Sequence, residues 1–394
     1  MWRRLCALNS AGADIFLLFW TGDAAHETPN GATLQRLGEK ASAVRYFVIP
    51  RTARERIRRL MRLSRWPSHV GSRVLNHSQY ARLISEIRPF SADAIWLDGI
   101  YGGVLARRLG DDLNIPFFCR SHNIEHIYMK EQIAKATEKR DKLAWQLNIP
   151  HLQRFEQETL AHACRFFDIS SDDLQYWKDH GLSNGEWLPP TIDAAFAQAA
   201  GQPPWAPAFD VGYIGNLYTP NNVDGVAWFV EQVLPELRLK RPEIRVFVAG
   251  ASPAARIVAL AQQSQIILAP DPPDVLPWFR NAKVLINPLR AGSGMNIKSV
   301  EMLFSPAQLV STPQGLAGLP AEARGCFTSA ENAHDFAAAV DQALETEDTA
   351  AQAARRIEAR TYFSPEKAAA LLKCLVDETK QWHAAPGRAN GNPE

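Results

Sequence analysis

The chain has 394 residues, which is more than one hydrophobic core usually serves and therefore predicts two domains. With 43 Lys and Arg against 42 Asp and Glu, its formal net charge is +1, which excludes a chain built as a whole to bind nucleic acid. The five cysteines are scattered without metal-ligand or redox spacing, which predicts reduced thiols in the cytoplasm. No apolar run reaches the roughly 18 residues of a membrane-spanning helix.

Short apolar runs alternate with amphipathic segments through the first half of the chain. We predict strands at 15–20, 44–49, 94–97, 116–119 and 166–169. This alternation is typical of a parallel sheet whose faces are covered by helices. Ser170 to Asp172 then cap a helix that is expected to end at Gly181.

A proline-rich stretch at residues 189–207 interrupts this rhythm and predicts a linker. Further strands are predicted at 209–214, 245–248, 265–268, 284–286 and 308–311. The expected fold class is therefore α/β, with two doubly wound, Rossmann-like domains. We assign residues 1–190 to the N-terminal domain, completed by a C-terminal helix at 363–382, and residues 191–362 to the second domain. Residues 383–394 are expected to be a disordered tail.

The stretch from Pro288 to Leu303 reads as strand, glycine loop and helix. Ligands bind beyond the carboxyl ends of strands in such sheets, glycines allow close backbone approach, and a helix start offers free N–H groups. Arg290 and Lys298 add two cations, so the loop favours a phosphate or pyrophosphate. It is neither a P-loop nor a dinucleotide fingerprint, because Ile297 stands where each requires glycine. A plain strand-to-helix turn with a surface lysine is the alternative interpretation.

The order of several short motifs resembles the family-4 retaining glycosyltransferases, which have the two-domain GT-B fold. The motifs are Ser121–Glu125, Val211–Asn216, Asp274–Phe279, Pro288–Arg290, Gly292–Gly294, Lys298, Glu301 and Ser311–Gly315. The resemblance covers about residues 1–380 and is strongest over 205–320. Two domains facing a cleft are expected from it.

The resemblance implies roles on the donor side for individual residues. Lys298 and Arg290 would neutralise the donor diphosphate, helped by backbone groups at Gly292, Ser293 and Gly294. Gly215 and Asn216 would lie near the phosphates, and Glu301 would accept hydrogen bonds from the ribose hydroxyls.

The resemblance also implies an acceptor side on the N-terminal domain. His122 would lie near the anomeric carbon of the sugar and, with Lys298 and Glu301, forms the expected catalytic set. Asp98 and Tyr101 are candidates for lining the acceptor side, and a role at the start of a helix is an equal alternative.

The activity implied by the resemblance is a retaining hexosyltransferase. It would move a sugar from a UDP- or GDP-linked donor to a glycan or lipid-linked acceptor in cell-envelope polysaccharide biosynthesis, without a metal or other cofactor. The nucleotide sugar is a co-substrate. Two alternatives stay open: an enzyme like the sugar-nucleotide 2-epimerases, and a truncated, non-catalytic pseudoenzyme that acts as an interaction protein.

Several positions depart from the family pattern. Asn296 stands where members often have Arg, and Pro306 and Gln308 replace the usual glycine and proline after Glu301. Ser293 occupies the place of a Glu that reads the sugar hydroxyls in many members, so the choice of sugar stays open. Members also usually begin with a strand and a glycine loop, whereas this chain begins with what reads as the end of a helix, closed by Gly12. We therefore expect the central first strand to be missing, either through a start codon assigned too far downstream, which we favour, or through gene damage.

Residues Arg51 to Arg73 hold eight arginines and a single acid, Glu55. Ile57, Leu60 and Met61 form an apolar stripe among them, as in a basic amphipathic helix. A solvated helix face is one interpretation. The functional hypothesis is docking to an anionic membrane, where each basic residue contributes ~1 kcal/mol. The expected location is cytoplasmic, with peripheral attachment to the inner leaflet.

Overall fold

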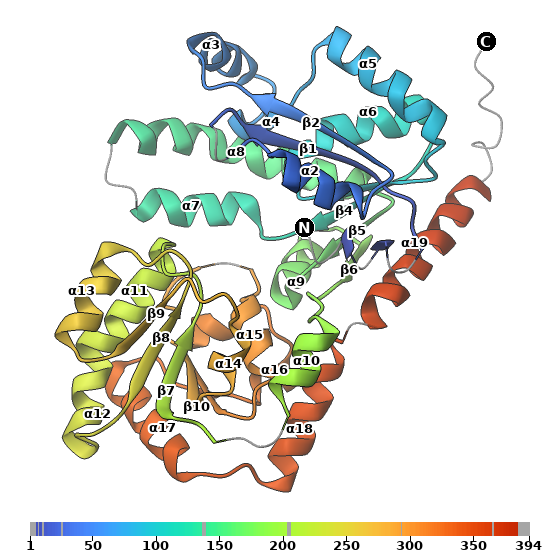
Figure 1. The fold of residues 1–394 in the computed structure, drawn as a ribbon. Coiled ribbons are helices and arrows are strands. Elements are labelled where there is room, and N and C mark those ends of the chain that lie inside the picture. Colours follow the sequence, from blue (N-terminus) through green and yellow to red (C-terminus); the bar gives the residue numbers. More distant parts are fainter. Residues whose placement is uncertain are drawn as a thin grey trace. The chain divides into compact units, whose positions relative to one another are not determined.

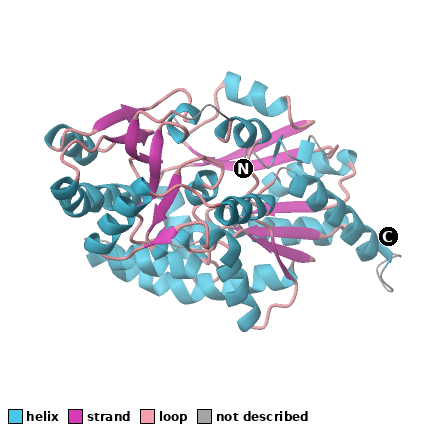
Figure 2. Ribbon diagram, turned by 90° about the horizontal axis from the view of Figure 1, so that it is seen from below, coloured by secondary structure: helices cyan, strands magenta, loops and turns pink. Residues whose placement is uncertain are grey.

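The computed structural model describes residues 5–6, 8–9, 12–24, 27–135, 139–202, 206–292, 294–364 and 366–384. Contacts divide the chain into two compact units (Figure 1). The first unit runs to Ile169 and adds Asp173–Leu188 and the segment from Glu366 onward, while the second holds Ser170–Asp172 and Pro189–Pro365. Both units are built of parallel strands surrounded by helices (Figure 2).

The described strands of the first unit form two separate parallel sheets. The strands are β1 (Phe16–Gly22), β2 (Ala43–Ile49), β3 (Ile95–Asp98), β4 (Phe117–Ser121), β5 (Arg165–Asp168) and β6 (Gly185–Trp187). One sheet pairs β1 with β2, and the other has the order β3-β4-β5-β6. Five of these strands are confirmed predictions. The three-residue β6 was missed because it is too short to show a pattern.

The strands of the first unit are interrupted between β1 and β3. In the part of the chain that the structure describes, no ladder joins these two strands. Their side chains nevertheless share one core, because Phe16, Trp20 and Ile95 pack on Leu83 and its buried neighbours. Gly12 has a left-handed backbone with φ +93°, as expected for a residue that ends a helix. Residues 1–4 lie outside the described residues.

The helices of the first unit follow the strands in alternation. They are α2 (Gly31–Gly38), α3 (Ala53–Arg62), α4 (Ser68–Gly71), α5 (His77–Ile87), α6 (Gly103–Leu113), α7 (Glu125–Lys135), α8 (Lys139–His162), α9 (Ser171–Asp179) and α19 (Glu366–Ala384), with short turns η1 (Arg88–Phe90) and η2 (Ile100–Gly102). The predicted end of α9 is confirmed by Gly181, which has φ +87°. No helix among the described residues is long and apolar enough to cross a membrane.

The second unit has one six-stranded parallel sheet in the order β12-β11-β10-β7-β8-β9. The strands are β7 (Phe209–Ile214), β8 (Val246–Gly250), β9 (Ile267–Pro270), β10 (Ala282–Asn287), β11 (Gln308–Ser311) and β12 (Thr328–Ser329). The strand order reverses beside β7, so β7 and β10 are neighbours at the centre of a doubly wound sheet. This topology and five of its strands are confirmed predictions, and the two-residue β12 was missed.

Helices cover both faces of this sheet (Figure 1). They are α10 (Ala194–Ala200), α11 (Pro220–Trp228), the π-helical η3 (Phe229–Val233), α12 (Leu234–Lys240), α13 (Ala255–Gln263), α14 (Leu276–Phe279), α15 (Ile297–Met302), η4 (Pro313–Leu316), α16 (Ala321–Arg324), α17 (Ala333–Glu345) and α18 (Ala350–Thr361). One face packs on α11, η3, α12, α13 and α17, and Trp278 of α14 packs on Phe209 and Phe247 of the other.

The predicted linker contains a helix, which corrects the sequence interpretation. Asp193 caps α10 through its side chain, and Phe196 packs edge-on against Phe279 with 5.2 Å between ring centroids. The prolines on either side obscured these seven helical residues, because proline clusters usually mark loops.

Candidate functional site

Lys298 lies buried at the carboxyl ends of the two central strands of the second unit. Its Nζ donates a hydrogen bond of 2.7 Å to the Tyr213 hydroxyl and lies 3.4 Å from the side-chain oxygens of Asn222 and Asn287. The ammonium also lies 4.1 Å from the centroid of the Tyr213 ring. Among the described residues, Lys298 forms no ion pair with a carboxylate. In the described part of the site, the amino group of Lys298 is therefore surrounded by neutral oxygens and a ring face.

The burial of Lys298 changes its proton affinity. Desolvation lowers the pKa of Lys298 to about 7, and the more distant negative charge of Glu301 partly opposes this shift. An anion arriving at the ammonium would raise the pKa again, because an opposite charge favours the protonated form. The side chain is therefore poised to respond to a bound phosphate. The alternative interpretation of Lys298 as a surface residue on a plain turn is wrong, since only 9% of it is exposed.

Gly215 makes room for this lysine. A Cβ atom there would lie 2.8 Å from Lys298 Cε and 2.9 Å from the Tyr213 hydroxyl oxygen, both too close. Asn216 follows and accepts hydrogen bonds through its side chain from Thr219, at 2.6 Å, and from Asn222, at 3.0 Å. The structure thus places Gly215 against Lys298, and Asn216 is linked to Lys298 through Asn222.

A network of buried polar groups holds the segment that follows β10 in place. Asn287 ends β10, is fully buried, and donates to the hydroxyl of Ser299 at 2.8 Å. Ser299 in turn donates to the Gly315 carbonyl at 2.6 Å. A Cβ at Gly315 would lie 2.8 Å from Asn287 Nδ2, so only glycine fits beneath this network.

The glycine loop itself has the backbone that its sequence predicts. Gly292 and Gly294 have φ of +150° and +72°, and the Gly292 carbonyl accepts a hydrogen bond from Gln314 at 2.7 Å. Arg290 is exposed, with its guanidinium carbon 5.5 Å from the Trp228 ring centroid. Ser293 lies outside the described residues.

The helix after the loop corrects one expectation. α15 has only six residues, and the Asn296 side chain already accepts a hydrogen bond of 3.1 Å from the Lys298 backbone N–H. The sequence suggested that Asn296 is the loss of a cation, but in the structure it is the N-cap of α15. Its side chain accepts from one of the backbone N–H groups that were expected to face a ligand. Glu301 is half-buried in the last turn of α15, one turn after Lys298.

The first unit has its own cluster at the carboxyl ends of β3 and β4. Asp98 Oδ1 accepts from Arg120 at 3.1 Å and lies 3.0 Å from His122 Nε2. Burial opposes ionisation of Asp98, but the hydrogen bond from His122 and the charge of Arg120 lower its pKa well below the ordinary value. The carboxylate therefore orients the His122 ring, which stays 35% exposed.

Tyr101 joins a second, deeper network beside this cluster. Its hydroxyl donates to Glu125 at 2.7 Å, and burial followed by the charge of Glu156 raises the pKa of Glu125, although the Tyr101 hydrogen bond opposes this. Glu156 is fully buried and accepts from the backbone N–H of Glu125 at 2.8 Å and from His126 Nδ1 at 2.7 Å. His126 is thus buried, and the Glu156 carboxylate caps the start of α7.

Sequence reasoning missed the residues that hold Lys298. Tyr213 lies in the buried part of strand β7, where it reads as one more core residue, and Asn222 sits in an ordinary polar helix start. The one available signal was Asn287, a polar residue ending a buried strand. Among the described residues, no group of three or more His, Cys, Asp or Glu is placed to hold a metal ion.

Comparisons with known proteins agree with this fold. Residues 208–346 match the family model described as glycosyl transferases group 1. A curated relative from Klebsiella pneumoniae, an uncharacterized 44.6 kDa protein in the cps region, is 26% identical over 117 residues. That match spans 28% of this chain and 30% of the relative.

Several solved structures share the whole architecture. Trehalose 6-phosphate synthase from Burkholderia multivorans is 14% identical with a TM-score of 0.57, covering 94% of this chain and 99% of that one. Sucrose-phosphate synthase from Thermosynechococcus elongatus is 12% identical, with a TM-score of 0.57 and coverages of 96% and 98%. HepE from Anabaena, solved in complex with UDP, is 12% identical, with a TM-score of 0.59 and coverages of 92% and 100%. The chain therefore has the GT-B glycosyltransferase fold, which confirms the predicted fold class.

Proposed function

We propose that this chain, with its group 1 glycosyl transferase domain, transfers a sugar from a nucleotide-diphosphate donor to a glycan or lipid-linked acceptor. The observation that carries the proposal is the Lys298 ammonium, buried where two central strands end and without an ion-pair partner among the described residues. Burying an unpaired charge is costly, and an anionic ligand would offset that cost. The family match over residues 208–346 contains this lysine and supports a diphosphate as the anion.

The chemistry follows from charge developing on the leaving group. When the bond between the anomeric carbon and the diphosphate oxygen breaks, its electron pair leaves with the diphosphate. Lys298 and Arg290 would stabilise that charge as fixed cations, and Glu301 would hold the ribose. We propose that no metal is required. Activity that survives EDTA would support this part, and activity restored only by Mg²⁺ would overturn it.

Retention of the anomeric configuration is the second part of the proposal. The acceptor hydroxyl would attack on the face from which the diphosphate leaves, and its proton would pass to the departing phosphate oxygen. Such a step depends on positioning more than on a strong base. His122, oriented by Asp98, and the Tyr101–Glu125 pair are the side chains that we assign to positioning on the acceptor side.

The donor base and the pathway are proposed from the relatives. HepE was solved with UDP, which makes UDP-sugars the first donors to try and leaves GDP-sugars as the second. The Klebsiella relative belongs to a cps region, which supports a place in polysaccharide biosynthesis at the cell envelope.

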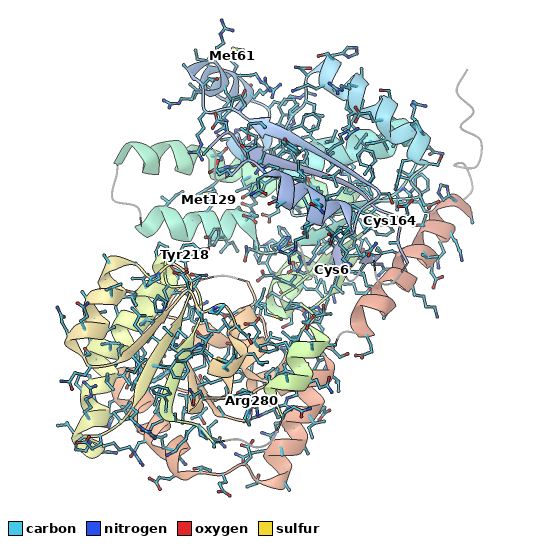
Figure 3. The ribbon with its side chains drawn as sticks, viewed as in Figure 1. Cys6, Met61, Met129, Cys164, Tyr218 and Arg280 are labelled. Carbon is cyan, nitrogen blue, oxygen red and sulfur yellow. The ribbon has the colours of Figure 1, made fainter. Side chains whose placement is uncertain are left out.

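We also propose that α3 attaches the protein to an anionic membrane surface at the cytoplasmic face. Its outward side chains Ile57, Leu60 and Met61 are 58%, 66% and 72% exposed, and Met61 is labelled on α3 in Figure 3. Arg54 and Arg56 are exposed, project to either side of this apolar strip, and make no ion pair among the described residues. An apolar strip between arginines is the pattern of a helix that lies in the headgroup region.

The opposite side of α3 is held to the protein. Glu55 is buried and pairs with Arg58 at 3.5 Å and Arg59 at 3.9 Å. Arg62 donates to the carbonyls of Gly71 and Val74 at 2.7 and 3.0 Å. The arginine run is thus divided: Arg62 fixes the helix to the neighbouring segment, Arg58 and Arg59 pair with Glu55 within the helix, and Arg54 and Arg56 flank the apolar strip.

A donor screen tests the proposed function. The protein is incubated with a panel of UDP- and GDP-sugars, and release of UDP or GDP is followed together with the proton NMR spectrum of the sugar. We expect slow hydrolysis of one donor, with the freed sugar appearing first as the anomer of the donor. Accumulation of the C2 epimer of a donor would favour the epimerase alternative. If none of the UDP- and GDP-sugars binds, the alternative of a non-catalytic interaction protein would be favoured.

A further inference from the structure

We propose that Tyr213 is a positioning residue that holds Lys298 Nζ in place for the donor diphosphate, in whichever protonation state the lysine arrives. This inference rests on the proposed donor binding and goes beyond it, because it assigns a role to a residue that otherwise reads as part of the core of strand β7. The Tyr213 hydroxyl makes the shortest hydrogen bond to the lysine, at 2.7 Å, from a side chain that is only 2% exposed.

The argument starts from what each neighbour of the lysine can do. The side-chain oxygens of Asn222 and Asn287 are acceptors only, so they favour an ammonium, and both lie at a long 3.4 Å. A phenol is both acceptor and donor: it accepts from an ammonium, and it donates to the lone pair of a neutral amine. Tyr213 can therefore keep Nζ at one position before and after the lysine gains a proton.

Tyr213 itself stays neutral throughout. Burial raises the pKa of its hydroxyl far above the ordinary value, so it does not compete with Lys298 for a charge near neutral pH. The charged group that acts on Lys298 from its own helix is Glu301, and the neighbours on α11 and β10 are the uncharged Asn222 and Asn287. The protonation of Lys298 is thus governed by burial, the Tyr213 hydroxyl and whatever anion binds.

Two consequences for donor binding follow. Above about pH 7, where the pKa of Lys298 in the empty protein lies, binding must be accompanied by uptake of a proton, so affinity should fall by up to tenfold per pH unit. Below that pH the lysine is already charged, and affinity should be flat. Tyr213→Phe keeps the ring face and removes only the hydroxyl, so donor affinity should fall roughly 10- to 100-fold. Without the Tyr213 hydroxyl as an acceptor, the ammonium form of Lys298 is disfavoured. The decline of donor affinity with rising pH should therefore begin at a lower pH in Tyr213→Phe than in wild type.

Calorimetry tests this with UDP-glucose and GDP-mannose as probes between pH 6 and 9, because their diester phosphates do not titrate there. Wild type, Tyr213→Phe and Tyr80→Phe are compared in two buffers of different ionisation enthalpy, which yields the protons taken up. Tyr80→Phe is the matched control, since it also removes a buried hydroxyl, one that donates to Asp112 at 2.6 Å in the first unit. An unshifted pH profile in Tyr213→Phe, with tight binding retained, would overturn the inference.

A second measurement works without any donor. Proteins expressed with ¹³C-labelled lysine, which leaves the amino group unmodified, are titrated by NMR in wild type, Tyr213→Phe and Lys298→Arg, the last to assign the signal. We expect the Lys298 midpoint to move to lower pH in Tyr213→Phe. An unmoved midpoint contradicts the role of Tyr213 even if neither probe binds, whereas a moved midpoint without binding contradicts only the proposed function.

Discussion

Asp98 decides how His122 is held, and this makes it the most informative single side chain in the first unit. Its carboxylate joins the buried Arg120 to the partly exposed His122. Asp98→Asn should reduce sugar transfer roughly 10- to 100-fold while donor affinity stays unchanged, because loss of a charge-assisted hydrogen bond costs about 1.5–3 kcal/mol. Steady-state kinetics with donor-binding calorimetry measures both.

The control for this variant is Asp93→Asn, which changes an exposed carboxylate five residues earlier. It should leave transfer within twofold of wild type. If Asp98→Asn weakened donor binding and transfer equally, or if the control were as impaired, Asp98 would have only a structural role.

Glu301 gives a second prediction for a single residue. If it accepts hydrogen bonds from the ribose, Glu301→Gln should weaken binding of UDP roughly tenfold, by about 1.5 kcal/mol, since a charged acceptor becomes neutral. Binding of 2′,3′-dideoxy-UDP should be weak in both proteins and differ little between them. An equal loss for both nucleotides would mean that Glu301 acts elsewhere, for instance on Lys298.

Helix α7 depends on one buried carboxylate of α8. Glu156 accepts from two backbone N–H groups at the start of α7 and from the ring of His126. Glu156→Ala leaves all three donors buried without a partner, so the free energy of unfolding should fall by about 3–5 kcal/mol in denaturant titrations. Glu158→Ala, which removes an exposed carboxylate paired with Arg154 on the same helix, should change it by less than about 0.5 kcal/mol. Similar losses in the two variants would contradict the capping role.

Helix α3 makes a separate prediction about membranes. Co-sedimentation with vesicles of 30% phosphatidylserine should detect binding that falls roughly 100-fold when Arg54, Arg56 and Arg65 become Ser, since each contributes ~1 kcal/mol. Replacing Ile57, Leu60 and Met61 by Ser should also weaken vesicle binding. This loss should be clearest at high salt, where the charges are screened and the apolar strip contributes most of the binding. Changing Arg82, Arg88 and Arg108, three exposed arginines elsewhere on the unit, is the matched control. Equal binding by all these variants would leave α3 as a solvated helix.

The strands and helices were predictable where a local sequence pattern alone determines the secondary structure. Short apolar runs predicted ten strands, and β7 and β11 agree with prediction at both ends. The short β6 and β12 have too few residues for any period, and they form because a neighbouring strand offers an open edge. α10 was hidden by its prolines, and its stability comes from the contact of Phe196 with Phe279, which no local pattern contains.

At the scale of the whole chain, the fold followed from the alternation of strands and helices, while the site followed only in part. Gly215, Lys298 and Glu301 stand out because their residue types are unusual at those places. Tyr213 and Asn222 could not be predicted, because strand β7 and helix α11 meet Lys298 only through tertiary packing. The role of Asn296 was also invisible, since a cap shows itself only once the start of the helix is known.

The most direct test of the central claim compares Lys298→Ala with Lys283→Ala under turnover with the donor found by screening. Lys283 lies on the strand that leads to the same loop, is exposed, and pairs with Asp210 at 3.1 Å. Lys298→Ala should lower kcat by about 10²–10³-fold, the usual cost of removing one group that stabilises developing charge, with an unchanged circular-dichroism spectrum. Lys283→Ala should turn over at the wild-type rate. Wild-type turnover by Lys298→Ala would contradict the account, because the buried ammonium would then have no part in holding the donor diphosphate.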